Sequence, residues 1–358
     1  MMMRMTRRLS AFAIALAVCM AACSKGSAGK AGPAAAGRKI KLGFSMDTLK
    51  EERWHRDRDL LVQRARELGA EVLVQAANGD DALQNSQAEN MLTQGVDVLL
   101  VAPHNGKTAA TIVESAHRAG VPVIAYDRLI NDADVDLYVS FDNERVGEMQ
   151  AEYLVARKPK GNYAVIGGSP TDNNALLYHQ GQMKILEPYV SRGDIRIVAD
   201  QWARDWLAVE ALKIMENALT TNANRVDAVV AANDGVAGGA IQALAEQKLA
   251  GTTLVSGQDA ELSACQRIAE GTQSMTVYKP IRLLAGKAAE VAVKMARKQP
   301  HGETTRGLPN GRIDVPSILI APTAVDRDNL VSTVVADGYQ KLEDVYKNVP
   351  KERWPRKP

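Results

Sequence analysis

The stretch Gly95-Val-Asp-Val-Leu-Leu-Val-Ala-Pro103, followed by Val121-Pro-Val-Ile-Ala-Tyr-Asp127-Arg128, decides the fold of this chain. The same arrangement returns in the second half, where Arg225-Val-Asp-Ala-Val-Val-Ala-Ala-Asn233-Asp234 is followed by Thr253-Leu-Val-Ser-Gly-Gln-Asp259. In each copy an apolar run of strand length stops at polar residues, a segment of helix length follows, and the next strand ends at an aspartate. Because the chain builds the same polar edge twice, we predict two lobes that face each other across a cleft.

Length and composition fit a soluble protein of two domains. The chain has 358 residues, of which 46% are hydrophobic and 24% are charged, as in ordinary globular proteins. Residues 1–22 hold three of the 44 basic residues and no acidic residue, which leaves 41 basic against 42 acidic residues in the remainder. A body so near neutrality argues against electrostatic binding to nucleic acid.

The N-terminus has the features of an export signal. In residues 1–22, Arg4, Arg7 and Arg8 precede an apolar run that ends at small residues. The segment Met20-Ala-Ala-Cys23 resembles a bacterial lipoprotein box, in which Cys23 would carry a lipid that anchors the protein to the membrane. Simple secretion with cleavage nearby is the alternative. Residues 23–38 then form a flexible linker of small residues.

Strands and helices alternate from Lys39 onward. The pattern predicts first-half helices at 56–68, 85–94 and 108–119, between strands that begin at Ile40, Val72, Val96 and Val121. It restarts after a helix at 145–156, with helices at 180–189, 207–219 and 236–247 between strands that begin at Tyr163, Ile195, Val226 and Thr253. Repeated βαβ units predict an α/β fold of two doubly wound lobes, each with a parallel sheet between helices.

Three segments fit neither repeat and are predicted to cross between the lobes as a hinge. They are residues 138–141, 275–279 and 313–320. The predicted N-terminal lobe therefore comprises residues 39–141 and 281–313, and the predicted C-terminal lobe comprises residues 142–280 and 314–345. Residues 346–358 are charged and contain several prolines, which predicts a poorly packed tail.

Polar and aromatic residues gather where the predicted strands end. Ligands of doubly wound sheets bind outside these carboxyl ends, so the residues there form the candidate site. The set contains Asp47, Arg53, Trp54, His104, Asn105, Asp127 and Arg128, then Asp172, Asn173, Asn174, Trp202, Trp206, Asn233, Asp234 and Asp259, with Lys279 in a hinge segment. Carboxylate, amide and guanidinium groups hydrogen-bond adjacent hydroxyls in pairs. Tryptophan adds a flat apolar face that suits a sugar ring.

Several of these residues also have a purely structural interpretation. An Asp or Asn that follows a strand often caps the next helix, and we favour this role for Asp234. Trp202 fits a core position equally well. We expect Arg56, Asp57 and Arg58 to form a solvated helix face.

Common catalytic and metal-binding patterns are absent from the sequence. Gly167-Gly168-Ser169-Pro170 lacks the remainder of a phosphate-binding loop, and no Gly-x-Ser-x-Gly elbow occurs. The five histidines do not have metal-ligand spacing, so we expect no metal site and no cofactor. Cys265 is the only cysteine of the predicted folded body and is expected to be a free buried thiol.

Four segments resemble the D-xylose-binding proteins of bacterial ABC sugar importers, which are periplasmic binding proteins of the ribose and galactose type. The match extends from about Lys39 to about Tyr339. The segments are Glu52-Arg-Trp-His-Arg-Asp-Arg-Asp59, Ala125-Tyr-Asp-Arg-Leu-Ile-Asn-Asp132, Gly167-Gly-Ser-Pro-Thr-Asp-Asn-Asn174 and Thr272-Gln-Ser-Met-Thr-Val-Tyr-Lys-Pro280. The resemblance implies two lobes that close over one pyranose.

The resemblance also implies a set of sugar-binding residues, with two tryptophans packed on the sugar. The set is Arg53, Trp54, Asp127, Arg128, Asn174, Trp206, Asn233, Asp259 and Lys279, with Asp47, Phe141 and Asp172 as further candidates. Two features depart from the family pattern. Many members are simply secreted, whereas this chain carries the lipoprotein box, and Gly235 replaces the small residue that is usual there.

These observations lead to the hypothesis of a monomeric, non-enzymatic subunit that captures D-xylose in the periplasm and delivers it to an ABC transporter permease. A sensor that presents its closed form to a signalling receptor, or a binding protein for another pentose or hexose, would share these features. A glycosidase with Asp127 and Asp259 as its carboxylate pair is a further alternative, but a closed cleft leaves no room for an aglycone.

Overall fold

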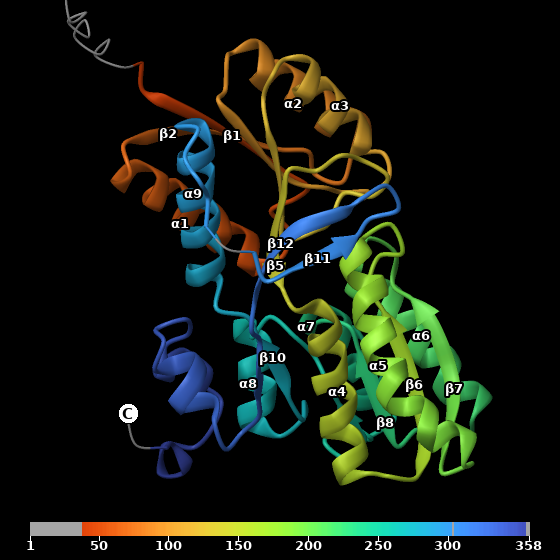
Figure 1. Cartoon of the computed structure of the whole chain (residues 1–358). Coiled ribbons are helices and arrows are strands. Elements are labelled where there is room, and N and C mark those ends of the chain that lie inside the picture. The colour runs from red at the N-terminus through yellow and green to blue at the C-terminus, as the bar shows by residue number, and fades with distance from the viewer. Residues whose placement is uncertain (1–37, 303, 356–358) are drawn as a thin grey trace, which may run out of the picture. The chain divides into compact units, whose positions relative to one another are not determined.

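Two largely parallel sheets with related strand orders form the framework of this protein (Figure 1). The computed structural model describes residues 38–302 and 304–355. The first sheet has the order β11-β12-β5-β4-β3-β1-β2, and the second has the order β7-β6-β8-β9. In both halves the first four strands therefore stand in the order second, first, third, fourth. This shared order confirms the duplication that the sequence predicts.

The first sheet is parallel except at β11, which pairs antiparallel with β12. Its strands are β1 (Ile40–Met46), β2 (Ala70–Ala76), β3 (Val98–Ala102), β4 (Val123–Tyr126), β5 (Leu137–Phe141), β11 (Arg306–Pro309) and β12 (Asp314–Ile320). The second sheet is wholly parallel. Its strands are β6 (Gly161–Gly167), β7 (Ile195–Trp202), β8 (Ala228–Ala231) and β9 (Leu254–Val255). A separate antiparallel pair joins β10 (Thr276–Tyr278) to β13 (Thr323–Val325).

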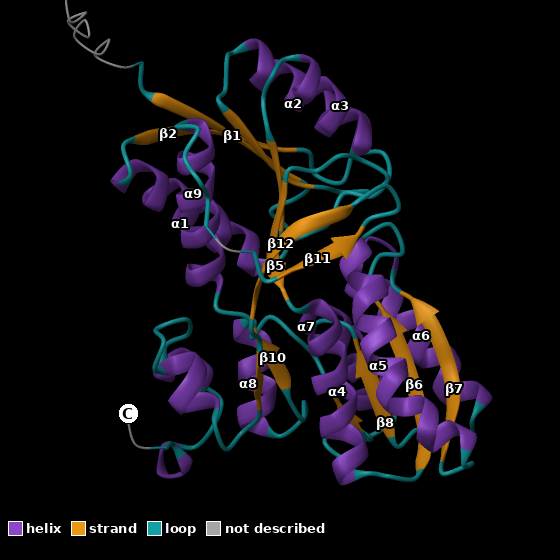
Figure 2. Ribbon diagram, viewed as in Figure 1, coloured by secondary structure: helices purple, strands orange, loops and turns teal. Residues whose placement is uncertain are grey.

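Helices cover both faces of the first sheet, as Figure 2 shows. Alternate residues of β3 point to opposite layers. Val98 and Leu100 pack with helices α1 (Glu52–Glu67) and α9 (Ile281–Ala296). Leu99 and Val101 pack with α2 (Asp81–Thr93) and α3 (Ala110–Arg118). A strand between two helical layers is buried on both sides, which is why β3 reads as an uninterrupted apolar run.

The second sheet is covered in the same way. Tyr163 and Val165 of β6 pack with residues of α4 (Asn143–Arg157) and α5 (Asn173–Ser191). Ala164 and Ile166 share a core with residues of α6 (Ala208–Thr221) and α7 (Asp234–Glu246). Two helical layers around each sheet are the arrangement that the repeated βαβ pattern predicts.

The described part of the C-terminal segment, residues 346–355, is anchored by packed apolar side chains, so the prediction of a loose tail from residue 346 is wrong there. Tyr346 is only 4% exposed, and its ring centroid lies 6.2 Å from that of Trp354. The segment shares a hydrophobic core with α8 (Leu262–Glu270) and α10 (Leu342–Val345). The prediction failed because lysines, arginines and prolines outnumber the apolar residues that anchor this segment.

Three further short helices occur among the described residues: η1 (Arg204–Trp206), η2 (Val331–Val335) and η3 (Lys351–Arg353).

Several predicted helices begin too late. Helix α1 begins at Glu52 rather than at residue 56, and α5 begins at Asn173 rather than at residue 180. The early turns carry polar site residues, which interrupt the apolar periodicity on which the prediction relied. Arg53, Trp54 and Asn174 therefore lie in first turns of helices rather than in loops. Helices α8 and α9 were not predicted.

The chain passes between the sheets after each of the three segments that fit neither repeat. Segment 138–141 is the end of β5, before α4. Segment 275–279 contains β10, before α9, and segment 313–320 contains β12, before β13. The prediction that residues 314–320 belong to the C-terminal lobe is wrong, because β12 pairs with β5 of the first sheet. That the three passages act as a hinge stays a prediction.

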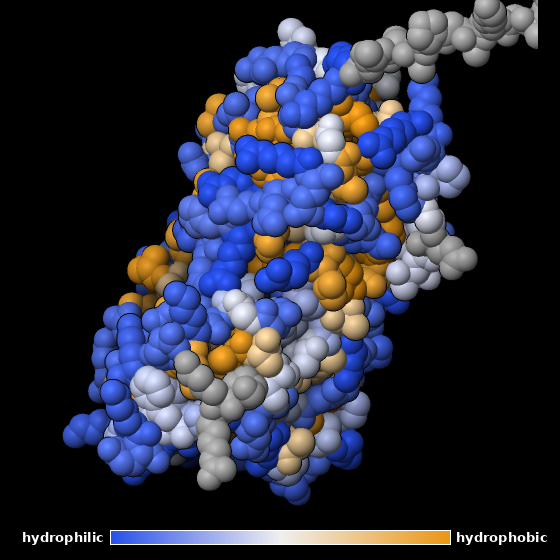
Figure 3. Space-filling view, turned by 90° about the vertical axis from the view of Figure 1, so that its left-hand side faces the viewer, coloured by the Kyte–Doolittle hydropathy of each residue, from blue (hydrophilic) through white to orange (hydrophobic). Residues whose placement is uncertain are grey.

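Hydrophilic residues dominate the face seen in Figure 3, with smaller hydrophobic areas between them. Leu83, Leu176, Val209 and Leu283 are large exposed hydrophobic residues, and they lie on four different helices. Single exposed apolar residues of this kind are normal. Within the described residues, no helix combines the length and apolar character that a membrane span requires.

We predict that the crossing of α4 and α5 tolerates no side chain at its two glycines. A methyl group on Gly181 would overlap the carbonyl oxygen of Glu144, and one on Gly147 would overlap that of Tyr178. Gly181→Ala should therefore lower the free energy of unfolding by about 1–3 kcal/mol, the usual cost of overpacking. Urea denaturation followed by circular dichroism measures this change.

Gly286→Ala is the matched control, since it makes the same change inside helix α9 with no atom within 4 Å of the added carbon. It should be neutral or stabilise by up to about 1 kcal/mol, because alanine favours the helix over glycine. Equal effects of the two substitutions would contradict the packing argument.

Candidate ligand-binding site

One pocket at the carboxyl ends of the two sheets collects every residue of the predicted sugar-binding set. It encloses about 300 Å³ of space between protein atoms, part of it open to solvent. Asp172 also lines it, together with three residues that the sequence reasoning missed: Glu51, Tyr178 and Gln258. The structure thus brings the predicted residues together, while their contact with a ligand stays a prediction.

Arg53 is the centre of one polar network in this pocket. Its guanidinium is buried against three carboxylates: Nε lies 3.1 Å from Asp57, Nη2 lies 2.7 Å from Asp127, and Nη1 lies 3.5 Å from Asp259. Asp57 also accepts a hydrogen bond of 2.5 Å from the Tyr126 hydroxyl. The prediction of Asp57 on a solvated helix face is wrong, because this carboxylate is fully buried and holds Arg53 in position.

Burial and neighbouring charges set the ionisation of these acids. Burial alone would raise the pKa of Asp127, but the positive charges of Arg53 and Lys279 outweigh it and hold this pKa below its ordinary value. Burial dominates at Asp57, whose pKa is raised despite the charge of Arg53. Asp127 therefore remains a hydrogen-bond acceptor at neutral pH.

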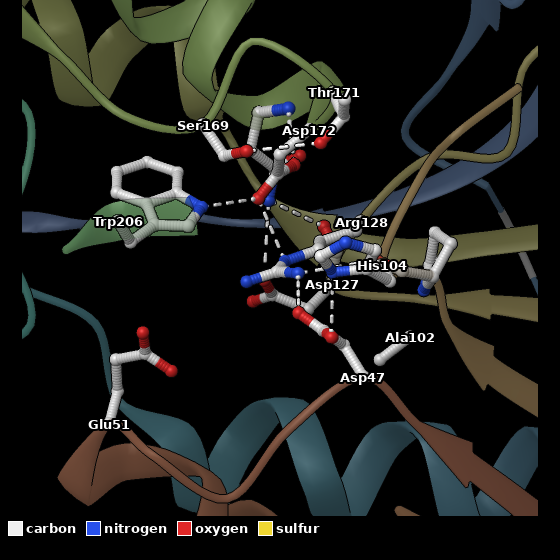
Figure 4. Close-up of polar contacts among 12 residues, drawn as sticks. Asp47, Glu51, Ala102, His104, Asp127, Arg128, Ser169, Thr171, Asp172 and Trp206 are labelled. Atoms are coloured by element: carbon white, nitrogen blue, oxygen red, sulfur yellow. Dashed lines mark hydrogen bonds and ion pairs between the residues drawn. The ribbon is translucent and has the colours of Figure 1, made fainter. Parts of the chain in front are cut away.

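Arg128 is the centre of a second network, shown in Figure 4. Its Nη1 donates to Asp47 at 2.6 Å, and its Nε lies 2.8 Å from Asp172. Asp172 also accepts a hydrogen bond of 3.2 Å from the indole nitrogen of Trp206. Asp47 follows β1 and Asp172 caps α5, so Arg128 connects the two sheets.

Asp47 and His104 lie behind Arg128 and not in the central pocket. The Nδ1 atom of His104 lies 2.9 Å from the Asp47 carboxylate, and both residues line a neighbouring pocket. Burial would raise the pKa of Asp47, but the charge of Arg128 and the hydrogen bond with His104 lower it to about 2. Asp47 therefore positions Arg128 rather than facing the central pocket.

Three residues at the pocket have a left-handed backbone. The φ angles are 62° at Asp127, 59° at Trp206 and 95° at Asp259. Residues other than glycine adopt this region at a cost of about 1–3 kcal/mol. At Asp127 the carbonyl oxygen accepts hydrogen bonds from the Tyr138 hydroxyl at 2.8 Å and from the Asn174 amide at 2.9 Å, which hold the conformation. Such strain is typical of binding sites.

Lys279 supplies the third cation of the pocket. It is only 2% exposed, and its ammonium lies 2.9 Å from Asp259. Phe141, at the end of β5, lies beside this ammonium, which is 5.5 Å from the centroid of the phenyl ring. Phe141 does not line the pocket. It supports Lys279 by a cation–π contact, while its own contact with a ligand stays a prediction.

Two indole rings form apolar walls. Trp54 lies in the first turn of α1, with the guanidinium carbons of Arg53 and Arg128 at 4.6 Å and 5.2 Å from its ring centroid. Trp206 lies in η1 and packs so closely on Gly168 that a Cβ atom there would overlap the indole. The missing side chain of Gly168 thus leaves the space that the Trp206 ring occupies.

Trp202 lies outside the pocket. Its ring contacts Gly167, where a Cβ atom would lie 2.5 Å from the indole, and its centroid is 5.1 Å from the imidazole of His179. The pair Gly167-Gly168 therefore makes room for two indole rings, which gives it a role unrelated to phosphate binding. Trp202 is partly buried against the core, in line with the structural interpretation.

Asn233, and not Asp234, caps helix α7. Its Oδ1 accepts a hydrogen bond of 2.8 Å from the amide of Val236, and the residue also lines the pocket. Asp234 is fully buried and accepts hydrogen bonds from Gln273 at 2.8 Å and Thr276 at 2.9 Å. The prediction of Asp234 as a cap is therefore wrong. Burial raises the pKa of Asp234 to about 7.

The remaining candidates lie outside the pocket. Asn105 accepts hydrogen bonds from the amides of Lys107 and Thr108 before α3, and Asn173 is the first residue of α5. Cys265 is a free buried thiol, as predicted. In the part of the chain that the structure describes, no group of three or more His, Cys, Asp or Glu residues could hold a metal ion.

The residues that sequence reasoning missed had weak signals. Gln258 directly precedes Asp259, and Glu51 lies two residues before Arg53. Tyr178 lies four residues after Asn174, on the same face of α5, and a helix predicted from Asn173 would have revealed it.

The pocket offers a hydrogen-bond acceptor that the protein itself does not satisfy. Across the described residues, Oε1 of Gln258 accepts no hydrogen bond, whereas Oδ1 of Asp259 is paired with the Lys279 ammonium at 2.9 Å. A buried acceptor without a donor costs about 1–3 kcal/mol. A neutral ligand with several hydroxyl groups would supply the donor.

Comparisons with known proteins show what this chain is similar to. Residues 42–300 match a family model described as a periplasmic binding protein domain. The chain is 55% identical over 313 residues to the D-xylose-binding periplasmic protein of Escherichia coli. The alignment covers 87% of this chain and 94% of the relative. The chain is 54% identical over 309 residues to the protein of that name from Haemophilus influenzae, with 86% and 93% covered.

A solved structure extends the likeness to the fold. The carbohydrate transporter solute-binding protein from Chloroflexus aurantiacus, in complex with D-glucose, matches with a TM-score of 0.80 and 31% sequence identity. The match covers 86% of this chain and 98% of that one.

We predict that Asp47 sets the ionisation of His104. The hydrogen bond with Asp47 raises the pKa of His104, and the Asp47 charge adds to this effect against burial. Because the folded pKa lies above the unfolded value of about 6.5, the pair stabilises the fold fully below that pH. The contribution is lost as the pH rises through the folded pKa. Asp47→Asn should lower the His104 pKa, as measured by NMR titration of the imidazole.

Asp136→Asn is the control, because it removes the carboxylate that lies 2.8 Å from His117 and leaves His104 untouched. An unchanged His104 pKa in Asp47→Asn, or an equal fall in both variants, would refute the assignment.

Proposed function

This chain belongs to the periplasmic binding protein family, and on that premise we propose that it binds D-xylose in the pocket of Arg53 and Arg128 and delivers the sugar to an ABC transporter. The pocket chemistry supports the class of neutral monosaccharides. The choice of D-xylose rests on relatives that carry this sugar in their names and share more than half of their residues with this chain.

The convergence of two polar strand edges on one pocket carries the proposal. Arg53, Asp127 and Arg128 come from the first sheet and its helices, and Asn174 and Asp259 come from the second. These groups are planar; buried ion pairs fix the four charged ones, and hydrogen bonds to Asp127 fix Asn174, so they can hydrogen-bond adjacent hydroxyls without reorganising. Each bond to a charged group contributes about 1.5–3 kcal/mol. The two indole walls supply apolar faces for the C–H groups of a pyranose.

The proposed carrier works by closing two lobes over the sugar. We assign residues 39–141 and 281–320 to one lobe and residues 142–280 and 321–345 to the other, which moves β12 to the first lobe. Contacts between Arg53 and Asp259, and between Arg128 and Asp172, already join the two sets of residues. A sugar that touches both sets binds the closed form better and shifts the population toward it.

A carrier role fits the carboxylates better than a hydrolytic one. A glycosidase needs one protonated carboxylic acid near the scissile bond. Arg53 and Lys279 hold the pKa of Asp127 low against its burial. Asp259 is engaged by the Lys279 ammonium at 2.9 Å. Neither carboxylate of the pair is therefore arranged as a general acid, and we propose that the protein is not an enzyme.

The proposed setting is the periplasm, where the permease of an ABC transporter would recognise the closed form of a monomer. We further propose that Cys23 carries a lipid that anchors the chain to the membrane. Cys23 and the signal segment lie outside the described residues, so this part of the proposal rests on the sequence of the lipoprotein box.

Calorimetric titration with D-xylose, D-ribose, L-arabinose, D-glucose and D-galactose tests the ligand. We expect tight binding of D-xylose, and Trp206→Ala should weaken it by at least ~30-fold, because truncating a buried aromatic anchor costs about 2 kcal/mol or more. Trp202→Ala removes an indole four residues away, outside the pocket, and should leave the affinity within a few-fold. Tight binding of another sugar in place of D-xylose would overturn the ligand assignment.

Mass spectrometry of the mature protein from membranes tests the anchor. We expect an N-terminal residue at Cys23 with added acyl mass, and recovery of the protein in the membrane fraction. Cys23→Ser should release it to the soluble periplasmic fraction, whereas Cys19→Ser, which removes a cysteine of the signal segment, should not. A mature N-terminus beyond Cys23 would exclude the anchor.

A further inference from the structure

Glu51 occupies the N-cap position of α1 but does not cap the helix. Its backbone is extended, with φ −77° and ψ 142°, and its side chain accepts no hydrogen bond from the first turn. Capping residues are ordinarily short, because their oxygen must fold back on the nearest amides. The longer side chain of Glu51 leaves the helix and points toward the space between Trp206 and Arg128, as Figure 4 shows.

The Glu51 carboxylate is buried without a hydrogen-bond donor. The side chain is 10% exposed, and in residues 38–302 and 304–355 no group donates a hydrogen bond to either oxygen. The Lys50 ammonium forms an ion pair with Oε1 at 3.1 Å and also donates a hydrogen bond of 2.5 Å to the carbonyl oxygen of Asp205. The ion pair with the half-exposed Lys50 compensates part of the cost of burying this carboxylate, but Oε2 has no partner among the described residues.

Glu51 stands at one end of the central pocket. It lines both this pocket and the neighbouring one that holds Asp47 and His104. Arg128 and Trp206 are the other residues common to both linings. A substituent on a bound ring that projects toward this end would therefore meet the Glu51 carboxylate.

The cations of the pocket are committed to carboxylates of the protein. Arg53 contacts Asp57, Asp127 and Asp259, Arg128 contacts Asp47 and Asp172, and Lys279 contacts Asp259. The pocket lining alone holds three basic side chains against four acidic ones once Glu51 is counted. Among the lining residues, no cation is left to compensate a negatively charged ligand.

We propose that Glu51 accepts a hydrogen bond from a hydroxyl of the bound sugar and that its charge makes the pocket select neutral sugars against sugar acids. This inference rests on the proposed sugar-binding function and names a specificity residue for it. A neutral sugar supplies the donor that the carboxylate lacks. A uronic or aldonic acid brings a second carboxylate into a pocket without a spare cation, and such like-charge juxtaposition is an effective means of rejecting a ligand.

Titration of the wild type and of Glu51→Gln with D-xylose, D-glucuronate and D-xylonate tests the proposal. The wild type should bind D-xylose and neither acid. Glu51→Gln keeps the shape and an acceptor oxygen but removes the charge. It should bind D-xylose about 10-fold more weakly, which corresponds to about 1.4 kcal/mol, and should bind at least one of the acids measurably.

Glu67→Gln is the matched control. It removes the same charge from the far end of α1, where the side chain is 47% exposed and does not line the pocket. Its affinities for all three ligands should equal those of the wild type. Circular dichroism melting of each variant checks that it is folded.

Two results would overturn the inference. One is a Glu51→Gln variant with wild-type affinity for D-xylose and continued exclusion of both acids. The other is a wild type that binds a sugar acid as tightly as D-xylose, a result that needs no variant and leaves the carrier function standing. Failure of the wild type to bind any neutral sugar of the panel would instead refute the proposed function itself, and the inference with it.

Discussion

Two buried guanidinium groups hold the candidate site together. A charge removed from water needs partners with good geometry, or it destabilises the fold. Arg53 forms ion pairs with carboxylates in α1 and after β4 and β9, and Arg128 forms ion pairs with carboxylates after β1 and before α5. The partners come from both sheets, so the same ion pairs that make burial of the arginines tolerable also fix the strand ends against each other.

This arrangement explains the kind of ligand that the pocket suits. Because the carboxylates of the protein neutralise its cations, the pocket presents fixed donors and unsatisfied acceptors rather than net positive charge. The left-handed backbones of Asp127, Trp206 and Asp259 turn these side chains into one space, at a cost that the surrounding hydrogen bonds offset. A ring with hydroxyls around its edge and C–H faces matches both the polar groups and the two indole walls.

Much of the fold could be predicted from local pattern. The apolar runs and the repeated spacing indicated both sheets, and a doubly wound sheet places a ligand at its strand ends. Three of the errors share one physical origin. Asp57, Asp234 and the tail residue Tyr346 were assigned to a solvated helix face, a helix cap and a loose tail because each was judged by its own polarity or by its neighbours in sequence. Their burial depends on partners such as Tyr126 and Gln273, which lie far away along the chain.

The sequence by itself determined the duplicated α/β plan and the residues that follow its strands, because hydrophobic period and turn chemistry act over a few residues. Only the tertiary structure decided that β12 joins the first sheet, that Asn233 rather than Asp234 caps α7, and that Glu51 faces the pocket. Each of these depends on which strand, amide or empty space lies opposite once the chain has folded. Pairing and burial of this kind are properties of contacts between distant residues, which local sequence patterns do not encode.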